Sequence, residues 1–129
     1  MVAVDTNVVV RLLANDSPAQ AARAAAIFLA GPVFIPKSVL LETEWVLRYS
    51  YGLETSAVSR ALRGVLGLLN VSVEDPVTVV IALGLLESGY DFAGALHVAS
   101  STSTERFVTL DTRLVKRSRG SSPVAVALA

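Results

Sequence analysis

The amino-acid sequence predicts an α/β fold, a three-layer α/β/α sandwich built on a parallel sheet of four or five strands. Short apolar runs alternate with longer segments whose apolar residues recur at helical spacing. Helix-starting and helix-ending residues stand between these segments. In 129 residues, 53% are hydrophobic and 17% are charged, a balance typical of one compact domain with a substantial core. We therefore expect residues 1–129 to form a single domain.

The order of the elements supports this fold class. The apolar runs that predict strands lie at residues 2–4, 33–35, 71–73, 107–110 and, as a weaker fifth, 124–126. The segments that predict helices lie at residues 8–13, 18–30, 36–51, 55–69, 74–88, 91–103 and from 111 onward. Asn15 to Ser17 supply the start signal of the second helix, with Pro18 at its first position. Because strands alternate with helices, the crossovers favour parallel pairing.

Acidic residues stand where a parallel sheet binds its ligands. Asp5 and Asp111 each directly follow a predicted strand, and Glu42 lies about one turn inside a predicted helix. Ligands of open parallel sheets bind beyond the carboxyl ends of the strands. Carboxylates that converge there repel one another unless a cation lies between them. A single Asp after a strand is also a common helix cap, so position alone leaves both interpretations open.

The composition decides what kind of metal such a site could hold. The chain has no cysteine, and His97 is its one histidine. Thiolate and histidine-rich zinc sites are therefore excluded. Mg²⁺ and Mn²⁺ prefer oxygen ligands, and either ion can promote hydrolysis of a phosphodiester. We expect any metal site to be an oxygen site.

A net charge of zero conceals a basic last quarter of the chain. Arg113, Lys116 and Arg117 are its candidates for binding an RNA backbone. A solvated helix face, with cations favoured at the helix end by the helix dipole, explains the same cluster equally well.

The longest apolar stretches are too short to cross a bilayer and no signal peptide is recognisable, so we expect a soluble cytoplasmic protein.

Four segments resemble one nuclease family. They are Val-Asp-Thr-Asn-Val at 4–8, Pro-Lys-Ser-Val-Leu-Leu-Glu-Thr-Glu-Trp-Val-Leu at 36–47, Asp-Phe-Ala-Gly-Ala-Leu-His at 91–97 and Phe-Val-Thr-Leu-Asp at 107–111. Their order and content resemble the PIN-domain ribonucleases, especially the VapC-like toxins of bacterial toxin-antitoxin pairs. The resemblance implies a Mg²⁺- or Mn²⁺-dependent endoribonuclease, usually a homodimer, that a cognate antitoxin holds inactive. It implies metal-site acids at Asp5, Glu42 and Asp111, and supporting polar residues at Thr6, Asn7 and Thr109.

One position departs from the family pattern. The third segment typically reads Asp-Phe-Ala-Asp-Ala, and its second Asp is a metal-site acid, whereas this chain has Gly94 there. Asp91 shares that helix face and either substitutes in part as a metal ligand or caps the helix, and we favour capping. Our hypothesis is that Gly94 replaces a catalytic Asp and weakens or inactivates the nuclease.

Other residues and functions remain open at this stage. Glu44 is expected at the surface or in an interface, and His97 is expected to be packed or hydrogen-bonded rather than a ligand. A catalytically impaired binding module, which dimerises and binds an antitoxin, is the main alternative function. A receiver-like or aspartate-based phosphoryl-transfer domain is disfavoured because the first strand ends in Asp-Thr-Asn rather than in a pair of acids. Dinucleotide binding is also disfavoured, because no Gly-x-Gly-x-x-Gly turn follows the first predicted strand.

Overall fold

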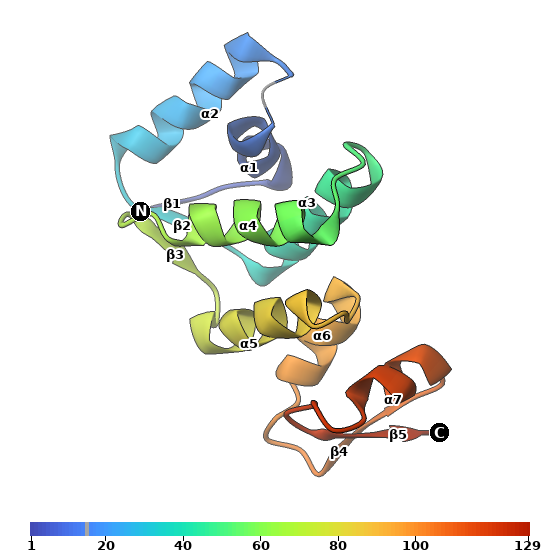
Figure 1. Ribbon diagram of the computed structural model, residues 1–129. Coiled ribbons are helices and arrows are strands. Elements are labelled where there is room, and N and C mark those ends of the chain that lie inside the picture. Colours follow the sequence, from blue (N-terminus) through green and yellow to red (C-terminus); the bar gives the residue numbers. More distant parts are fainter. Residues whose placement is uncertain (15) are drawn as a thin grey trace. The chain divides into compact units, whose positions relative to one another are not determined.

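Helices and strands alternate along the chain, as Figure 1 shows. The computed structural model describes residues 1–14 and 16–129, so the predicted start signal at Asn15 lies outside the described residues. The described elements are β1 (Val2–Ala3), α1 (Thr6–Leu13), α2 (Pro18–Ala30), β2 (Val33–Ile35), α3 (Lys37–Tyr49), α4 (Thr55–Leu66), β3 (Val71–Val73), α5 (Pro76–Glu87), α6 (Phe92–Ala99), β4 (Arg106–Thr109), α7 (Thr112–Ser118) and β5 (Ala125–Leu128). They form two compact units, Met1–Pro76 and Val77–Ala129.

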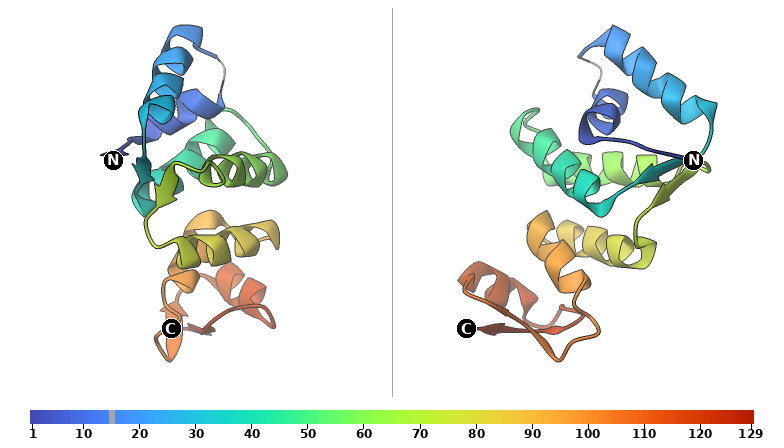
Figure 2. Two further views of the ribbon diagram at one scale, coloured as in Figure 1. Left: turned by 90° about the vertical axis from the view of Figure 1, so that its left-hand side faces the viewer. Right: turned by 180° about the vertical axis from the view of Figure 1, so that it is seen from behind.

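The first unit is built on a three-stranded parallel sheet in the order β1-β2-β3. Val33 of the central strand pairs in register with Val2 on one side and Val71 on the other. Helix α1 packs against α2 and α3, and α3 packs against α4. The strands lie side by side in both views of Figure 2. The fully buried side chains of this unit include Val9, Val33, Ile35, Leu40, Leu47, Val58 and Leu62.

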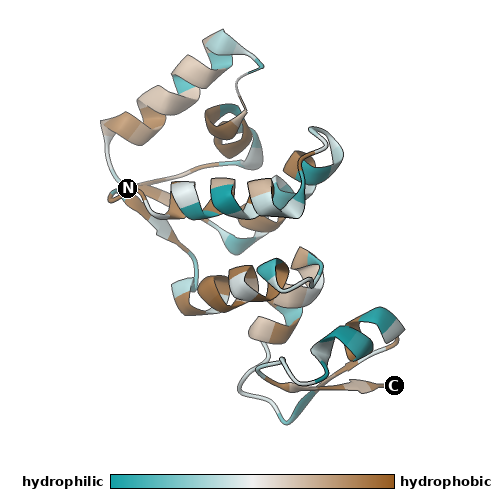
Figure 3. Ribbon diagram, viewed as in Figure 1, coloured by the Kyte–Doolittle hydropathy of each residue, from teal (hydrophilic) through white to brown (hydrophobic). Residues whose placement is uncertain are grey.

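The second unit combines two apolar helices with a small parallel ladder. Strands β4 and β5 pair from Arg106 opposite Ala125 to Thr109 opposite Leu128, and α7 packs on both. Helix α5 is hydrophobic on all sides, whereas α7 is mostly hydrophilic (Figure 3). Among the described helices, none combines the length and the apolar character that a membrane span requires. The core of this unit includes the buried side chains of Val79, Leu83, Phe92 and Val98.

The α/β class and the parallel pairing of the strands are confirmed. The sequence predicted one sheet of four or five strands, whereas the described strands pair in two ladders, one in each unit. The strands have only two to four residues, so each forms few ladder hydrogen bonds with a neighbouring strand. Sequence patterns locate such strands but do not specify which of them pair.

Two helices end earlier than predicted. Helix α4 ends at Leu66 rather than near residue 69, because Gly67 forms its C-cap. Helix α6 ends at Ala99 rather than near residue 103. The hydroxyl of Ser101 donates to the His97 carbonyl, 2.8 Å away, and that of Thr104 donates to the Ser101 carbonyl. Serine and threonine hydroxyls compete in this way with helical hydrogen bonding, which accounts for the shorter helix.

Candidate functional site

Asp5 lies at the carboxyl end of β1, where the chain turns into α1. Buried Val4 extends the strand by donating its N–H to the Phe34 carbonyl, 3.2 Å away. Asp5 is the N-cap of α1, and its Oδ1 accepts the Thr6 N–H at 2.7 Å. The capping interpretation of Asp5 is therefore confirmed, although the side chain remains exposed to solvent. A carboxylate in this place can cap the helix with one oxygen and bind a cation with the other.

Thr6 connects Asp5 to the second acid of the same unit. The Thr6 hydroxyl donates to Glu42 Oε1 at 2.9 Å, across 36 positions of sequence. Thr6 is buried, whereas Glu42 lies on an exposed face of α3. The carboxylates of Asp5 and Glu42 therefore both bind the same residue, one through its backbone N–H and one through its hydroxyl. Asn7 follows on α1 with its side chain exposed.

In the second unit, Asp91 caps α6 and fills the space beside Gly94. Asp91 Oδ2 accepts the Gly94 N–H at 2.9 Å, which confirms the predicted cap. A Cβ atom added to Gly94 would lie 2.7 Å from Asp91 Oδ1 and 3.2 Å from Leu114 Cδ1. Any side chain at position 94 would therefore displace the Asp91 carboxylate from the place it occupies.

Asp111 caps the next helix, α7. Its Oδ1 accepts the N–H groups of Arg113 at 2.9 Å and Leu114 at 3.3 Å, and its own N–H donates to the Thr109 hydroxyl at 3.0 Å. Thr109 thus fixes the turn that presents Asp111. A cavity of about 560 Å³ opens beside this turn. Its lining residues are Gly89, Tyr90, Asp91, Asp111, Arg113, Leu114, Lys116 and Arg117.

The predicted acids are thus distributed over both units. Asp5 and Glu42 belong to the first unit, and Asp91 and Asp111 belong to the second. Within either unit, the described residues bring no three His, Asp or Glu side chains close enough to hold an ion. The donors are all carboxylate oxygens, which suits a hard divalent ion. A common site for Asp5, Glu42 and Asp111 remains a prediction.

Comparison with known families identifies the domain. The PIN domain family matches residues 2–120. The chain belongs to the PIN domain family. The match extends over both units and confirms the resemblance to PIN domains that was read from the four segments. PIN domains are generally metal-dependent nucleases, they commonly bind RNA and they often act with antitoxins. A search of curated proteins gave no significant match.

One acid of this PIN domain is not where the sequence suggested. Glu44 was expected at the surface or in an interface, and that expectation is wrong, because only 2% of the residue is exposed. Its carboxylate accepts from Arg48 Nε at 2.8 Å, and this hydrogen bond raises the pKa of Arg48. The four-residue spacing from Glu to Arg was the available signal, since such pairs meet on a helix face.

His97 is exposed, and its ring stacks on Phe107 with centroids 6.1 Å apart.

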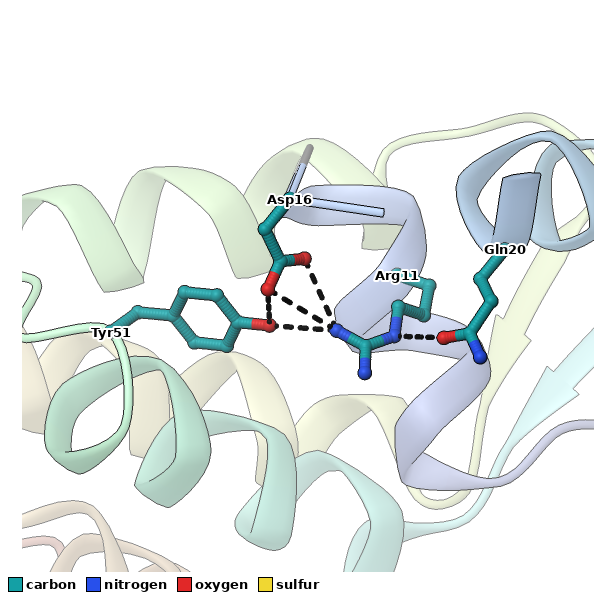
Figure 4. Close-up of polar contacts among 4 residues, drawn as sticks. All are labelled: Arg11, Asp16, Gln20 and Tyr51. Carbon is teal, nitrogen blue, oxygen red and sulfur yellow. Dashed lines mark hydrogen bonds and ion pairs between the residues drawn. The ribbon is translucent and has the colours of Figure 1, made fainter. Parts of the chain in front are cut away.

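A polar network also braces α1 (Figure 4). The Arg11 guanidinium donates to Gln20 on α2, to Asp16 at 3.1 Å and to the Tyr51 hydroxyl at 2.9 Å. The Tyr51 hydroxyl in turn donates to Asp16 at 2.9 Å, which raises the pKa of Tyr51. Tyr51 and Asp16 lie 35 positions apart in the sequence, and no local pattern predicts a contact at that separation.

Proposed function

We propose that the chain is a metal-dependent endoribonuclease toxin of a toxin-antitoxin pair, whose cleavage of RNA is weakened or abolished by Gly94. Membership of the PIN family supports nuclease chemistry in general. The observation that carries the proposal is the Thr6 bridge, which draws the carboxylates of Asp5 and Glu42 to one residue at the carboxyl end of β1. A helix cap alone would not require Glu42 to be oriented by a buried threonine.

In this proposal Asp5, Glu42 and Asp111 hold a Mg²⁺ or Mn²⁺ ion. When bound, the ion supplies charge neutralisation of the phosphodiester and activation of water. Thr6 restrains the Glu42 carboxylate, and Thr109 restrains the turn that carries Asp111. The cations of α7, Arg113, Lys116 and Arg117, hold the RNA backbone. Each of these residues is assigned a binding or positioning role.

Gly94 removes one carboxylate from the set that the family pattern contains. Asp91 is the nearest acid, but one of its oxygens is engaged with the Gly94 N–H at 2.9 Å. A metal site that has one carboxylate ligand fewer binds a divalent ion less tightly. We therefore expect the chain as written to cleave RNA much more slowly than a variant with Asp at position 94.

The partners in this proposal are a cognate antitoxin, a second copy of the chain and an RNA substrate in the cytoplasm. Trp45 and Tyr49 on α3 support a protein-binding surface. Both are more than half exposed, and their rings pack with centroids 4.9 Å apart. Tyrosine and tryptophan are enriched at protein interfaces relative to the rest of the surface.

Cleavage of a mixed cellular RNA pool tests the proposal. We would compare the protein as written, Gly94→Asp and Gly94→Asp combined with Asp5→Ala, each with Mg²⁺ or Mn²⁺ and with chelator. Gly94→Asp is expected to cleave at least about tenfold faster than the protein as written, because it restores a metal-site charge. The added Asp5→Ala or the chelator should remove that cleavage. Failure of folded Gly94→Asp to cleave any RNA would sink the nuclease assignment.

A catalytically impaired binding module is the second candidate, and the contact between Asp91 and position 94 favours it. Because Asp91 Oδ1 lies 2.7 Å from the site of a Cβ, the α6 cap is arranged around a residue without a side chain. If the added Asp leaves the protein inactive but folded and dimeric, this candidate takes precedence. Sedimentation of the unmodified chain would then measure its remaining property, self-association.

A further inference from the structure

The first unit contains a cavity of about 370 Å³ in the groove between α1 and α3. The two helices pack against each other. From α1 the cavity is lined by Asn7, Val10 and Arg11, and from α3 and the residues that follow it by Val46, Ser50 and Tyr51. The three residues of α1 are spaced by three and four positions, so they share one face of that helix. The groove therefore has a wall from each helix.

Two hydrogen bonds cross from α1 to the α3 side and bound the cavity at its ends. The Thr6 hydroxyl donates to Glu42 Oε1 at 2.9 Å, one helical turn before Val46. The Arg11 guanidinium donates to the Tyr51 hydroxyl, also at 2.9 Å, beyond the end of α3 (Figure 4). Because Glu42 and Val46 are four positions apart, they share a face of α3. A group bound in the cavity therefore lies beside one of the acids proposed to hold the ion.

The charges that line this cavity cancel. The Arg11 guanidinium pairs with Asp16, which also lines the cavity, at 3.1 Å. A phosphate placed there would meet a cation that already has a carboxylate partner, so the cavity favours a neutral ligand over an anion.

The remaining lining residues suit a flat group with a polar edge. Val10, which is 2% exposed, and half-buried Val46 supply apolar surface. The side chains of Asn7 and Ser50 are exposed, and neither has a hydrogen bond to any other described residue. The Asn7 amide can both donate and accept, which matches the mixed donors and acceptors on the edge of a nucleobase. Unstacked bases of single-stranded RNA are recognised in this way, by contact with a face and by hydrogen bonds to an edge.

We propose that this cavity binds one nucleobase of the RNA substrate, that of the nucleotide next to the reacting phosphate. The inference rests on the proposed function, in which that phosphate lies at the ion held by Asp5 and Glu42 together with Asp111. The base contacts Val46 with one face, and Asn7 binds its polar edge. Asn7 is thereby a residue that determines which base is accepted, in addition to its place beside the acids.

Binding of single nucleotides tests this proposal without cleavage. The ¹⁵N-labelled protein as written would be titrated in chelator with the four nucleoside 5′-monophosphates, followed by NMR of its backbone amides. Ribose 5-phosphate, which has the same sugar and phosphate but no base, is the ligand control. At least one nucleotide is expected to shift the amide signals of Asn7, Arg11 and Ser50, whereas ribose 5-phosphate should leave them unchanged.

Two variants separate recognition from folding. Asn7→Ala should weaken binding of the preferred nucleotide about fivefold, because one hydrogen bond to the base is lost. Its Tm should not fall, since the amide has no partner among the described residues and alanine is the better helix former. Ser56→Ala, at an exposed position of α4 outside the cavity, is the control variant and should bind normally.

Three results would overturn the proposal. They are the absence of shifts at Asn7, Arg11 and Ser50 with every nucleotide, equal shifts with ribose 5-phosphate, and undiminished affinity in Asn7→Ala. The titration requires neither the ion nor cleavage. Base binding by a protein that cannot cut therefore leaves this inference standing while the nuclease assignment fails, and a protein that cuts RNA but gives no base-dependent shifts loses only this inference.

Discussion

Position 94 is where a single side chain determines both helix structure and chemistry. Glycine inside a helix is less favourable than alanine by about 1 kcal/mol, and α6 has Gly94 in its first turn. The structure shows what the glycine accommodates, since the Asp91 carboxylate occupies the space of a side chain at this position. The loss of helix propensity is thereby offset by an N-cap, which contributes about 1 kcal/mol. Gly94 and Asp91 act as a pair.

This coupling predicts a dependence on background. Gly94→Ala is expected to be almost neutral in the protein as written, because the gain in helix propensity is offset by displacement of the cap. In an Asp91→Ala background, the same change should stabilise by about 0.5 to 1 kcal/mol, since no carboxylate remains to be displaced. Urea unfolding of the four proteins in the cycle measures both values. Equal effects of Gly94→Ala in the two backgrounds would show that the residues are independent.

At the scale of elements, the Arg11 network ties α1 to α2 and to the end of α3. This matters for the site because α1 begins at Thr6, the residue that binds both Asp5 and Glu42. Tyr51 closes the network through its hydroxyl, and the hydrogen bond to Asp16 raises the pKa of Tyr51 above its usual value near 10. A raised pKa means that the protonated hydroxyl is favoured in the folded state.

The sign of this shift gives a pH prediction. The stability contributed by the Tyr51 hydroxyl is fully present below pH 10 and is lost as the pH rises through the raised pKa of the folded state. Tyr51→Phe should therefore lower the Tm at pH 7 to 9 and should lose less of its remaining stability above pH 10 than the unmodified protein does. Thermal unfolding across this range, with Tyr49→Phe as the control, measures the difference. Parallel Tm curves for the unmodified protein and Tyr51→Phe above pH 10 would contradict the prediction.

The elements also show what sequence patterns could and could not predict. Every described helix and strand overlaps a segment where apolar spacing and caps predicted one, because these are local properties of the chain, although α1 begins two residues earlier than predicted and β5 ends two residues later. The capping of Asp5, Asp91 and Asp111 was equally accessible, because a cap is decided by its own turn. Contacts between distant positions were not accessible. The bond from Thr6 to Glu42 and the burial of Glu44 depend on how α1 and α3 pack, which no local pattern encodes.

At the scale of the whole molecule, positive charge is concentrated locally although the net charge of the chain is zero. The net charge of zero predicts no general affinity for nucleic acid, yet three cations line one cavity of the second unit, Arg113, Lys116 and Arg117. Sequence reasoning found the cations because they cluster along α7.

The predicted metal site is likewise a property of the whole chain, since its acids come from both units. A ligand that binds only the folded protein raises its Tm, so Mn²⁺ at about 1 mM should raise the Tm by about 2 to 4 °C. If Asp5 and Asp111 hold one ion, Asp5→Asn and Asp111→Asn should each abolish the shift, and Gly94→Asp should enlarge it. Glu105→Gln, an exposed acid outside the proposed site, is the control and should retain the shift. A shift that survives one of the two asparagine variants would place the ion in a single unit and would refute a site shared by both.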